Sequence, residues 1–352
     1  MIARILKLKL TKTQETQLNQ WLWNLTGVYN WAIKKIEHDA NDKIYHSTFD
    51  FVNMTANHSK KMGIPSHTLH GVSSQACNAW QRCFKKLANK PHLKGFRNKL
   101  NSIPFPDPLK PPKDNKIGIP GIGKVRYHKQ DLPEAKIKCG RMVKRASGWY
   151  LCLWLDTEHK FPVKQTDKAV GIDPGFDTLL TLSDGTKIEN PRELRKGSRR
   201  LEQAQRSCKK KLVARIQERQ ANRRRDRNHK ISRKLVENYK TIYYSDDNFK
   251  AMAKRFGKSI SEAALGNLIG MTTYKCRIGG RKIVPINSFR TTMTCSACGA
   301  LTGPTGFAGL KVRYWVCSAC GAHHDRDINS AKVVFNVGVG TTHERTAIQK
   351  IA

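Results

Sequence analysis

The sequence predicts a multidomain α/β protein with a metal-stabilised hairpin near its C-terminus. Residues 168–190 indicate a strand, a tight turn and further strands joined by an Asp184–Gly185 hairpin, and alternating helical and extended patterns follow, which is typical of an α/β core. Four cysteines late in the chain have the spacing of a zinc site. Ahead of this core, the alternating apolar and polar residues of 2–10 and 135–157 predict half-buried strands.

The N-terminal half is predicted to form a small β-barrel from residues 1–10 and about 100–160, interrupted by a helical insert. Apolar residues recur at helical spacing over 13–38 and again over 72–88, whereas the proline-rich stretch 89–120 excludes a regular helix. Four tryptophans of the helical stretches are interpreted as packing core rather than surface: Trp21, Trp23, Trp31 and Trp80.

The C-terminal half alternates between helical and extended patterns. A long basic segment at 192–240 is predicted to be helical, β-rich runs at 241–244 and 281–286 predict strands, and a helix is expected over 259–278. A last helix is expected to begin near Asp327. No apolar run approaches the roughly 20 residues needed to cross a bilayer, so no membrane contact is expected.

The charge balance indicates nucleic acid as the main partner. The 352 residues include 65 Lys and Arg against 27 Asp and Glu, a formal charge of +38 that is spread along the chain. So large an excess opposes compaction unless a polyanion neutralises it. Composition alone fits a nucleic-acid enzyme and a structural packing protein equally well. Because no secretory segment precedes the first strand, a cytoplasmic, nucleoid-associated protein is expected.

Four of the ten cysteines form two Cys-x2-Cys pairs separated by eighteen residues: Cys295, Cys298, Cys317 and Cys320. This is the spacing of a tetrahedral zinc site. Four thiolates leave no open position for water, so the predicted zinc is structural. The two histidines that follow, His323 and His324, are expected to be surface residues rather than ligands.

Two aspartates at the ends of predicted elements are candidate ligands for a second metal. Asp173 ends a β-rich run, and Asp327 opens the last helix. If carboxylates from such distant segments meet at one sheet edge, they could hold magnesium, which prefers hard oxygen ligands and retains water as a nucleophile. The alternative is that Asp173 is a turn residue and that Asp325 or Asp327 caps a helix, and spacing does not decide between the two.

The segments GIDPGFDTLLTLSDG and CGAHHDRDINSAKVV contain the candidate carboxylates. The first resembles the first RuvC motif of the TnpB family, and the second resembles that family's final motif, CGxxxDRDxNAA. TnpB proteins are transposon-encoded RNA-guided nucleases related to type V CRISPR effectors and to Fanzor proteins. The segments VYNWA, KGFRNKLNSIPFP and GRKIVPINSFRTTMTCSACG are also similar to family segments, so the resemblance covers most of residues 1–340.

The resemblance implies an RNase H-like (RuvC) nuclease core with an inserted zinc hairpin. It implies a core at 166–290 and 322–340, a hairpin at 291–321, a wedge-like β-barrel at 1–10 and 100–165, a helical recognition insert at 11–99 and a flexible tail at 341–352. It also implies that Asp173 and Asp327 are catalytic magnesium ligands, that the four cysteines hold zinc, and that Asp325 has a supporting role.

The second RuvC motif departs from the family pattern. The family strand ends in Glu-Asp-Leu-Asn, but here Ser245 stands where the glutamate is expected. Either cleavage is lost, or another carboxylate takes over. Glu262 is the preferred replacement, although Ser259 to Glu262 also fits a capping box. Asp247 and Asp246 are the alternatives, and Asp247 is the better of the two because it shares a strand face with Ser245.

Two basic segments are candidate nucleic-acid surfaces. Phe96 among Lys94, Arg97 and Lys99 suits phosphate contact combined with base stacking. A run of arginines on the predicted long helix suits the phosphates of a guide–target duplex, unless it is only a solvated face: Arg223, Arg224, Arg225 and Arg227.

The predicted function is therefore that of a magnesium-dependent, RNA-guided DNA endonuclease. Its partners are expected to be a guide RNA, which selects the site by base pairing, and double-stranded target DNA. The alternative is a nuclease-dead, RNA-guided DNA-binding protein that acts as a transcriptional repressor. A packing protein would give no reason for a four-cysteine hairpin beside Asp325-Arg326-Asp327.

Overall fold

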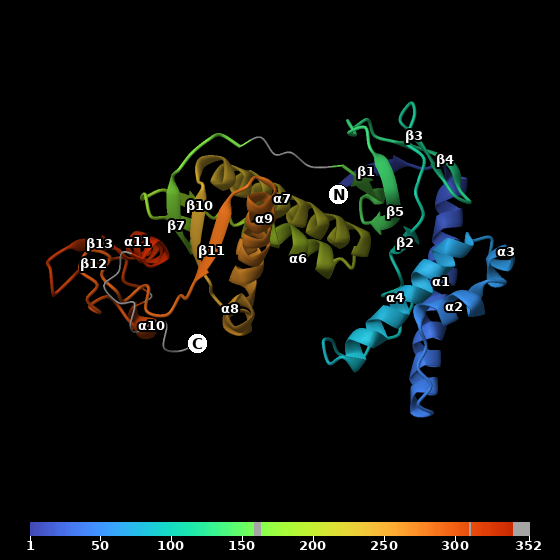
Figure 1. Cartoon of the computed structure of the whole chain (residues 1–352), viewed down its shortest axis with the longest axis horizontal. Helices are drawn as coiled ribbons and strands as arrows, with labels where there is room; N and C mark the ends of the chain where they lie inside the picture. The colour runs from blue at the N-terminus through green and yellow to red at the C-terminus, as the bar shows by residue number, and fades with distance from the viewer. Residues whose placement is uncertain (158–162, 310, 341–352) are drawn as a thin grey trace. The chain divides into compact units, whose positions relative to one another are not determined.

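The chain forms two compact units, Met1–His159 and Lys160–Ala352, each with its own hydrophobic core (Figure 1). The computed structural model describes residues 1–157, 163–309 and 311–340, so the predicted tail at 341–352 lies outside the described residues. None of the helices in these ranges combines the length and the apolar character needed to cross a membrane.

The first unit contains a six-stranded antiparallel sheet. Its strands are β1 (Ile2–Lys9), β2 (Ser102–Phe105), β3 (Lys116–Ile119), β4 (Gly123–Tyr127), β5 (Lys136–Arg145) and β6 (Gly148–Asp156). Their order is β2-β5-β6-β1-β4-β3, which leaves β2 and β3 as edges. The predicted barrel is therefore not closed by strand pairing in the described part of this unit.

Four helices connect β1 to β2: α1 (Lys12–Asn41), α2 (Thr48–Thr55), α3 (His58–Met62) and α4 (Ser66–Phe84). α1 starts at a capping box in which Thr11 and Gln14 bond each other's backbone N–H groups. Trp21 and Trp80 are buried, as predicted, but Trp23 and Trp31 are 51% and 40% exposed. The prediction of a core role was wrong for these two, because both lie outside the apolar stripe of α1.

The second unit is built on a five-stranded mixed sheet in the order β11-β10-β7-β8-β9. The strands are β7 (Ala169–Pro174), β8 (Thr178–Leu182), β9 (Lys187–Glu189), β10 (Thr241–Ser245) and β11 (Lys282–Ile286). β7, β10 and β11 are parallel, whereas β8 and β9 continue from β7 as antiparallel hairpins. The strand, turn and hairpin pattern predicted for residues 168–190 is confirmed.

The helices of this unit are α5 (Glu193–Lys196), α6 (Ser198–Arg206), α7 (Lys210–Asn238), α8 (Phe249–Ala263), α9 (Leu265–Ile278), α10 (Gly306–Gly309) and α11 (Arg326–Val339). The single helix predicted for 259–278 was wrong, because Ala264 adopts a left-handed conformation (φ 52°) between α8 and α9. Since α8 begins at Phe249, with Asn248 as its N-cap, Ser259 caps nothing. The capping-box interpretation of Ser259 to Glu262 was therefore also wrong.

Helices cover both faces of the second sheet, and the alternation of side chains assigns each residue to a face. Val170 and Ile172 of β7 belong to a core shared with residues of α7 and α9. Gly171 faces α11, where a Cβ would lie 2.3 Å from the carbonyl oxygen of Ala331, so the close approach of helix and strand requires glycine. Asp173, two residues after Gly171, is therefore on the α11 face as well.

Candidate metal centres and nucleic-acid surfaces

Four thiols in the second unit form the tightest group of potential metal ligands. The sulfur atoms of Cys295, Cys298, Cys317 and Cys320 all lie within 4.8 Å of one another. Two of the separations are 3.8 Å (Cys295 to Cys320) and 3.7 Å (Cys298 to Cys317). Tetrahedral zinc with bonds of about 2.3 Å places its sulfur ligands about 3.8 Å apart. The thiols therefore fit zinc and are much too far apart for disulfides.

The cluster is supported by its own neighbours and by α11. The Thr302 hydroxyl donates to the Cys317 sulfur (3.1 Å) and lowers the pKa of that thiol to about 6. The Nε2 atom of His324 lies 3.0 Å from the Cys295 sulfur, so the expectation that His324 is merely a surface residue was wrong. Asn329 of α11 accepts from the Ser296 N–H and donates to the Thr294 carbonyl, which ties the hairpin to the helix.

A second set of groups gathers where the parallel strands β7 and β10 end. Burial raises the pKa of Asp173 to about 8, and the negative charges of Asp247 and Asp327 contribute to the rise. The Ser330 hydroxyl of α11 lies near the same carboxyl and opposes the rise of its pKa, but it makes no hydrogen bond of normal geometry with any described residue. The structure thus brings together carboxylates from three distant segments, and their mutual repulsion is the environment that a divalent cation relieves.

Ser245 is the last residue of β10, and Asp247 follows two residues later. Tyr244 pairs with Ile172, so Ser245 lies at the level of Asp173 in the neighbouring strand β7. Ser245 is 1% exposed, and its hydroxyl lies 3.4 Å from a carboxylate oxygen of Asp247. Burial raises the pKa of Asp247. Asp246, by contrast, is exposed.

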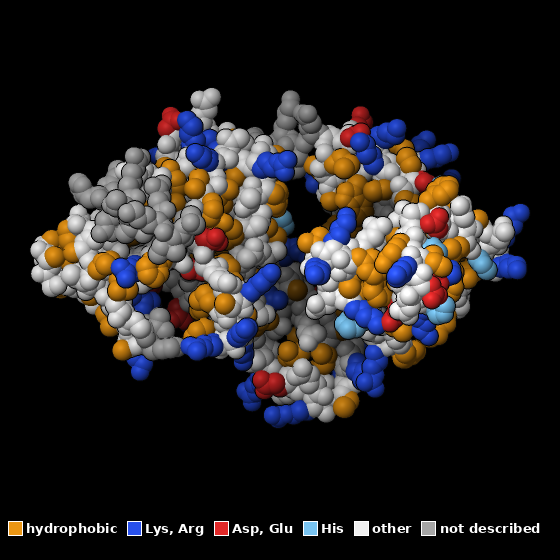
Figure 2. Space-filling model, turned by 60° about the horizontal axis from the view of Figure 1, so that its bottom comes forward, with side chains coloured by type: hydrophobic (Ala, Val, Ile, Leu, Met, Phe, Trp, Pro, Cys, Tyr) orange, Lys and Arg blue, Asp and Glu red, His pale blue; other side chains and the backbone are white. Residues whose placement is uncertain are grey.

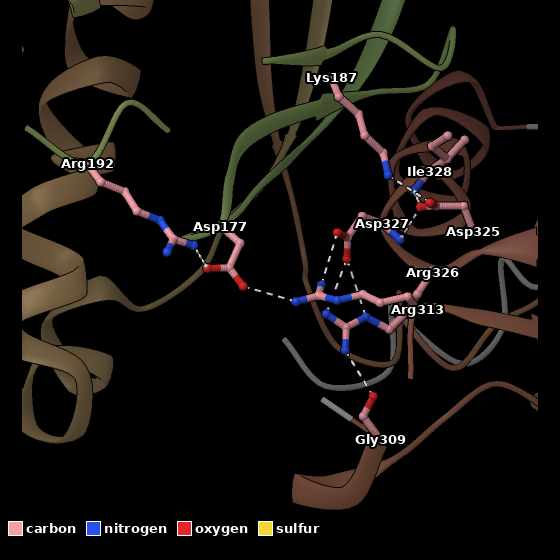
Figure 3. A network of polar contacts seen from close by, with 9 residues as sticks. All are labelled: Asp177, Lys187, Arg192, Gly309, Arg313, Asp325, Arg326, Asp327 and Ile328. Atoms are coloured by element: carbon pink, nitrogen blue, oxygen red, sulfur yellow. Dashed lines mark hydrogen bonds and ion pairs between the residues drawn. The ribbon is translucent and has the colours of Figure 1, made fainter. Parts of the chain in front are cut away.

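The carboxylate of Asp327 is paired with two guanidinium groups (Figure 3). Its Oδ2 pairs with Arg313 (3.3 Å) and its Oδ1 with Arg326 (3.2 Å), while Arg313 also pairs with Asp177 (3.0 Å). Its neighbour Asp325 caps α11 by accepting from the N–H groups of residues 327 and 328. Asp325 is therefore the residue that caps α11. The carboxylate of Asp327 points instead to Arg313 and Arg326.

Glu262 has a different environment. Its side chain is 2% exposed, accepts from the backbone N–H of Arg195 (3.1 Å) and pairs with the guanidinium of Arg195 (3.1 Å). The charges that act most strongly on Asp173 are those of Asp247, Asp327 and Arg326. Glu262 therefore ties α8 to α5, whereas Asp247 lies with the carboxylates of β7 and α11.

A groove of about 490 Å³ separates α5 and α6 from α7. Its lining includes five cationic side chains: Lys196, Arg200, Arg215, Arg219 and Arg223. Arg215, Arg219 and Arg223 recur every four residues, about 6 Å apart along α7. Gln220 also lines the groove, and its amide nitrogen has no hydrogen-bond partner among the described residues. The sequence missed Arg200, Arg215 and Arg219 because basic residues are common along this entire segment.

The arginines predicted to contact nucleic acid differ in their surroundings. Arg225 is exposed, and Arg223 pairs with Glu193 (3.0 Å) at the groove. Arg224 is partly buried. Arg227 donates to Asn190, Asn228 and the Ala263 carbonyl, so its donors serve packing between α7 and α8. In the first unit, Phe96 and Arg97 are exposed, and Lys94 and Lys99 are half-buried.

Positive side chains extend well beyond these segments. Figure 2 shows Lys and Arg side chains distributed over the visible face of the molecule, with few Asp and Glu between them. This distribution agrees with the formal charge of +38. It favours sequence-independent attraction of a polyanion over one localised patch.

Comparison with known proteins relates the second unit to transposase-type proteins. Residues 153–255 match the family model described as "Probable transposase", and residues 266–334 match "Cas12f1-like, TNB domain". A "Putative RNA-guided DNA endonuclease" of Streptomyces pristinaespiralis is 36% identical over 56% of this chain and 52% of its own length. The chain thus spans about half of that relative.

Two further relatives extend the similarity. The "Putative RNA-guided DNA endonuclease InsQ" of Escherichia coli (strain K12) is 24% identical over 78% of this chain and 75% of its own length. The "TnpB-like protein L79" of Acanthamoeba polyphaga mimivirus is 24% identical over 51% of this chain and 39% of its own length. Together with the family models, these matches confirm the resemblance to the TnpB family.

Proposed function

We propose that the chain is an RNA-guided DNA endonuclease that hydrolyses phosphodiester bonds with magnesium held by Asp173, Asp247 and Asp327. The observation that carries this proposal is the gathering of three carboxylates at one sheet edge, where burial raises the pKa of Asp173 to about 8 and the charges of Asp247 and Asp327 add to the rise. The names of the relatives supply the RNA-guided part of the proposal.

In this proposal the side chains around the carboxylates have separate tasks. Magnesium, when bound, supplies an acidified water and neutralises charge on the phosphate. Ser245 lacks a carboxylate, but its hydroxyl lies next to Asp247 and can orient it. Arg313 and Arg326 hold Asp327 in position. We assign Glu262 a packing role, because its buried carboxylate is already paired with Arg195.

The nucleic acid would be held along its phosphates. We propose that the six-stranded sheet of the first unit, with the helical insert 11–99, holds the guide RNA and binds a short DNA motif beside the target. The groove beside α7 would contact the guide–target duplex, because a row of guanidinium groups suits a row of phosphates better than a single anion. No aromatic residue is among the side chains that line it, which favours contact with a backbone over stacking on bases.

Cleavage is tested with protein purified together with the RNA that it retains. The complex is incubated with magnesium and a plasmid library that carries the matching target beside a randomised flank. Depletion of particular flanks is expected, and Asp173→Asn should slow it about 1,000-fold or more. The matched control is Asp226→Asn, an acid of α7 that pairs only at the surface with Lys230. Matching DNA that is bound but stays intact would favour the nuclease-dead repressor.

The groove is tested by the salt dependence of duplex binding. Each phosphate contact contributes about 0.9 to the slope of log K against log salt for a duplex. The variant Arg215→Gln/Arg219→Gln should therefore lower the slope by about 2. Arg199→Gln/Arg206→Gln removes the same charge from α6 outside the groove lining and should leave the slope unchanged. Equal changes in both variants would show that only net charge matters.

A further inference from the structure

A second concave site lies in the first unit, along α1. It has a volume of about 800 Å³ and is lined by two segments, residues 30–39 of α1 and residues 93–95. Asn30 joins these segments, because its side chain donates to the Lys94 carbonyl (2.7 Å) and accepts from the Lys94 N–H (2.8 Å). The wall formed by residues 93–95 is therefore fixed to the helix by a matched pair of hydrogen bonds.

Aromatic rings are exposed in and beside this pocket. Trp31 lines it, is 40% exposed and makes an edge contact with the buried ring of Phe51 (5.6 Å). Two turns earlier on α1, Trp23 makes an edge contact with Phe96 (6.3 Å), a ring that is 79% exposed. The segment 93–96 thus runs along α1 and is flanked by exposed aromatic rings at two positions, one at Trp31 and one at Trp23 and Phe96. These two positions are about 12 Å apart along the helix axis. Exposed, positioned rings of this kind serve ligands with flat faces.

The charges around the pocket are positive, apart from one internally compensated acid. Asp39 is buried and accepts from Lys35 (2.8 Å), from His38 (3.2 Å) and from His46. The hydrogen bonds from Lys35 and His46 hold the pKa of Asp39 well below its usual range. Lys34 forms no ion pair with any described residue. Lys34 can therefore meet an anion at the rim. The ammonium of Lys94 lies 6.0 Å from the ring centre of Tyr29, a contact that leaves its charge without an acidic partner among the described residues.

We infer that this pocket binds an unpaired nucleotide of a nucleic-acid strand, with its base against Trp31 and its phosphate near Lys34 and Lys94. A ring with adjacent lysines matches a base with adjacent phosphates, and the second aromatic level at Trp23 and Phe96 suits a neighbouring part of the same strand. A duplex would not fit, because its base faces are covered by their own stack. The inference deepens the proposed function by giving a site for single-stranded segments of guide or target.

The test measures binding of 12-nucleotide oligouridine, oligothymidine and a 12-base-pair duplex by fluorescence anisotropy without magnesium. Trp31→Leu should weaken binding of a single strand about 5- to 150-fold and leave duplex binding within about twofold, since stacking is lost with only one of these partners. Trp31→Phe should restore most of the affinity. Phe49→Leu is the matched control, because Phe49 is exposed on α2 and does not line the pocket.

A second variant tests the site without removing the Trp31 ring, so that its effect does not depend on whether Trp31→Leu folds. Lys34→Gln leaves the aromatic ring in place and should lower the salt slope for single strands by about 0.7. A larger loss with oligouridine would assign the site to RNA, and a larger loss with oligothymidine would assign it to unwound DNA. Unchanged single-strand binding in both variants, or equal losses with the duplex, would overturn the inference. Because magnesium is absent, the outcome is independent of whether the protein cuts DNA.

Discussion

The two candidate metal centres of the second unit differ in how the chain builds them. The four thiols come from one hairpin and lie within 4.8 Å of one another. The carboxylates come from β7, from the residues after β10 and from α11, segments separated by most of the unit. A local centre is therefore specified by its own turns, whereas the distant one depends on strand order and on the packing of α11.

The two centres also differ in what balances their charge. The thiols are supported by weak contacts with Thr302 and His324, and close thiolates repel one another. Asp327 already has Arg313 and Arg326 as partners. We therefore expect the hairpin to need its metal in order to fold, whereas the carboxylate site folds without one and uses metal only for activity.

Removal of zinc should have the largest effect. Cys295→Ser/Cys317→Ser is expected to abolish zinc binding and unfold the hairpin, because structural zinc contributes about 10–16 kcal/mol of apparent binding energy in comparable sites. Zinc content by atomic absorption and limited proteolysis of residues 291–325 measure the loss. Cys208→Ser, at an exposed free cysteine, is the control. A hairpin that remains protected from protease without metal would contradict the expectation that the hairpin needs zinc in order to fold.

The third carboxylate is decided by a pair of variants. Asp247→Asn should slow cleavage about 1,000-fold with an unchanged melting temperature, because it removes a ligand and no packing. Glu262→Gln should keep the cleavage rate of folded molecules but destabilise the protein by about 2 kcal/mol, because it breaks a buried pair whose partner Arg195 is partly exposed. The reverse outcome would make Glu262 the ligand.

The carboxylate centre should also show in the pH dependence of stability without metal. The folded state raises the pKa of Asp173 to about 8, so between about pH 4 and pH 8 folded molecules hold a proton that unfolded molecules have released. The contribution of Asp173 to stability therefore falls as pH rises through this window. Asp173→Asn should melt higher than the parent at pH 8, with a difference that shrinks towards pH 4. A constant difference would mean that the folded state does not raise the pKa of Asp173.

The smallest expected effect concerns the support of the zinc site. Thr302→Val removes the hydroxyl that donates to Cys317 and should weaken zinc binding about tenfold, the lower end for such supporting contacts. Competition with a zinc chelator measures the change. Thr305→Val, in the same loop but outside the cluster, should leave zinc affinity unaltered. A loss equal to that of a cysteine variant would show that the hydroxyl is needed for folding.

Sequence patterns predicted the local features well. The thiol spacing placed four candidate ligands in one hairpin, and the β-rich run before Pro174 predicted the strand that carries Asp173. They failed where the outcome depended on packing between segments. Trp23 and Trp31 are tryptophans of a helical stretch like Trp21, but only the observed stripe of α1 separates exposed from buried positions. The prediction of one helix across 259–278 missed the break between α8 and α9, because propensity does not show a left-handed residue at Ala264.

The amino-acid order by itself indicated the four-thiol hairpin and the strand that carries Asp173, because each Cys-x2-Cys pair and the β-rich run are patterns of neighbouring residues. Only the structure shows that Asp325, and not Asp327, caps α11. Tertiary structure alone decided that Asp247 joins Asp173 and Asp327 while Glu262 pairs with Arg195. The reason is physical: the position of a buried carboxylate follows from which helix covers which face of the sheet, and that choice is made by the packing of the entire unit.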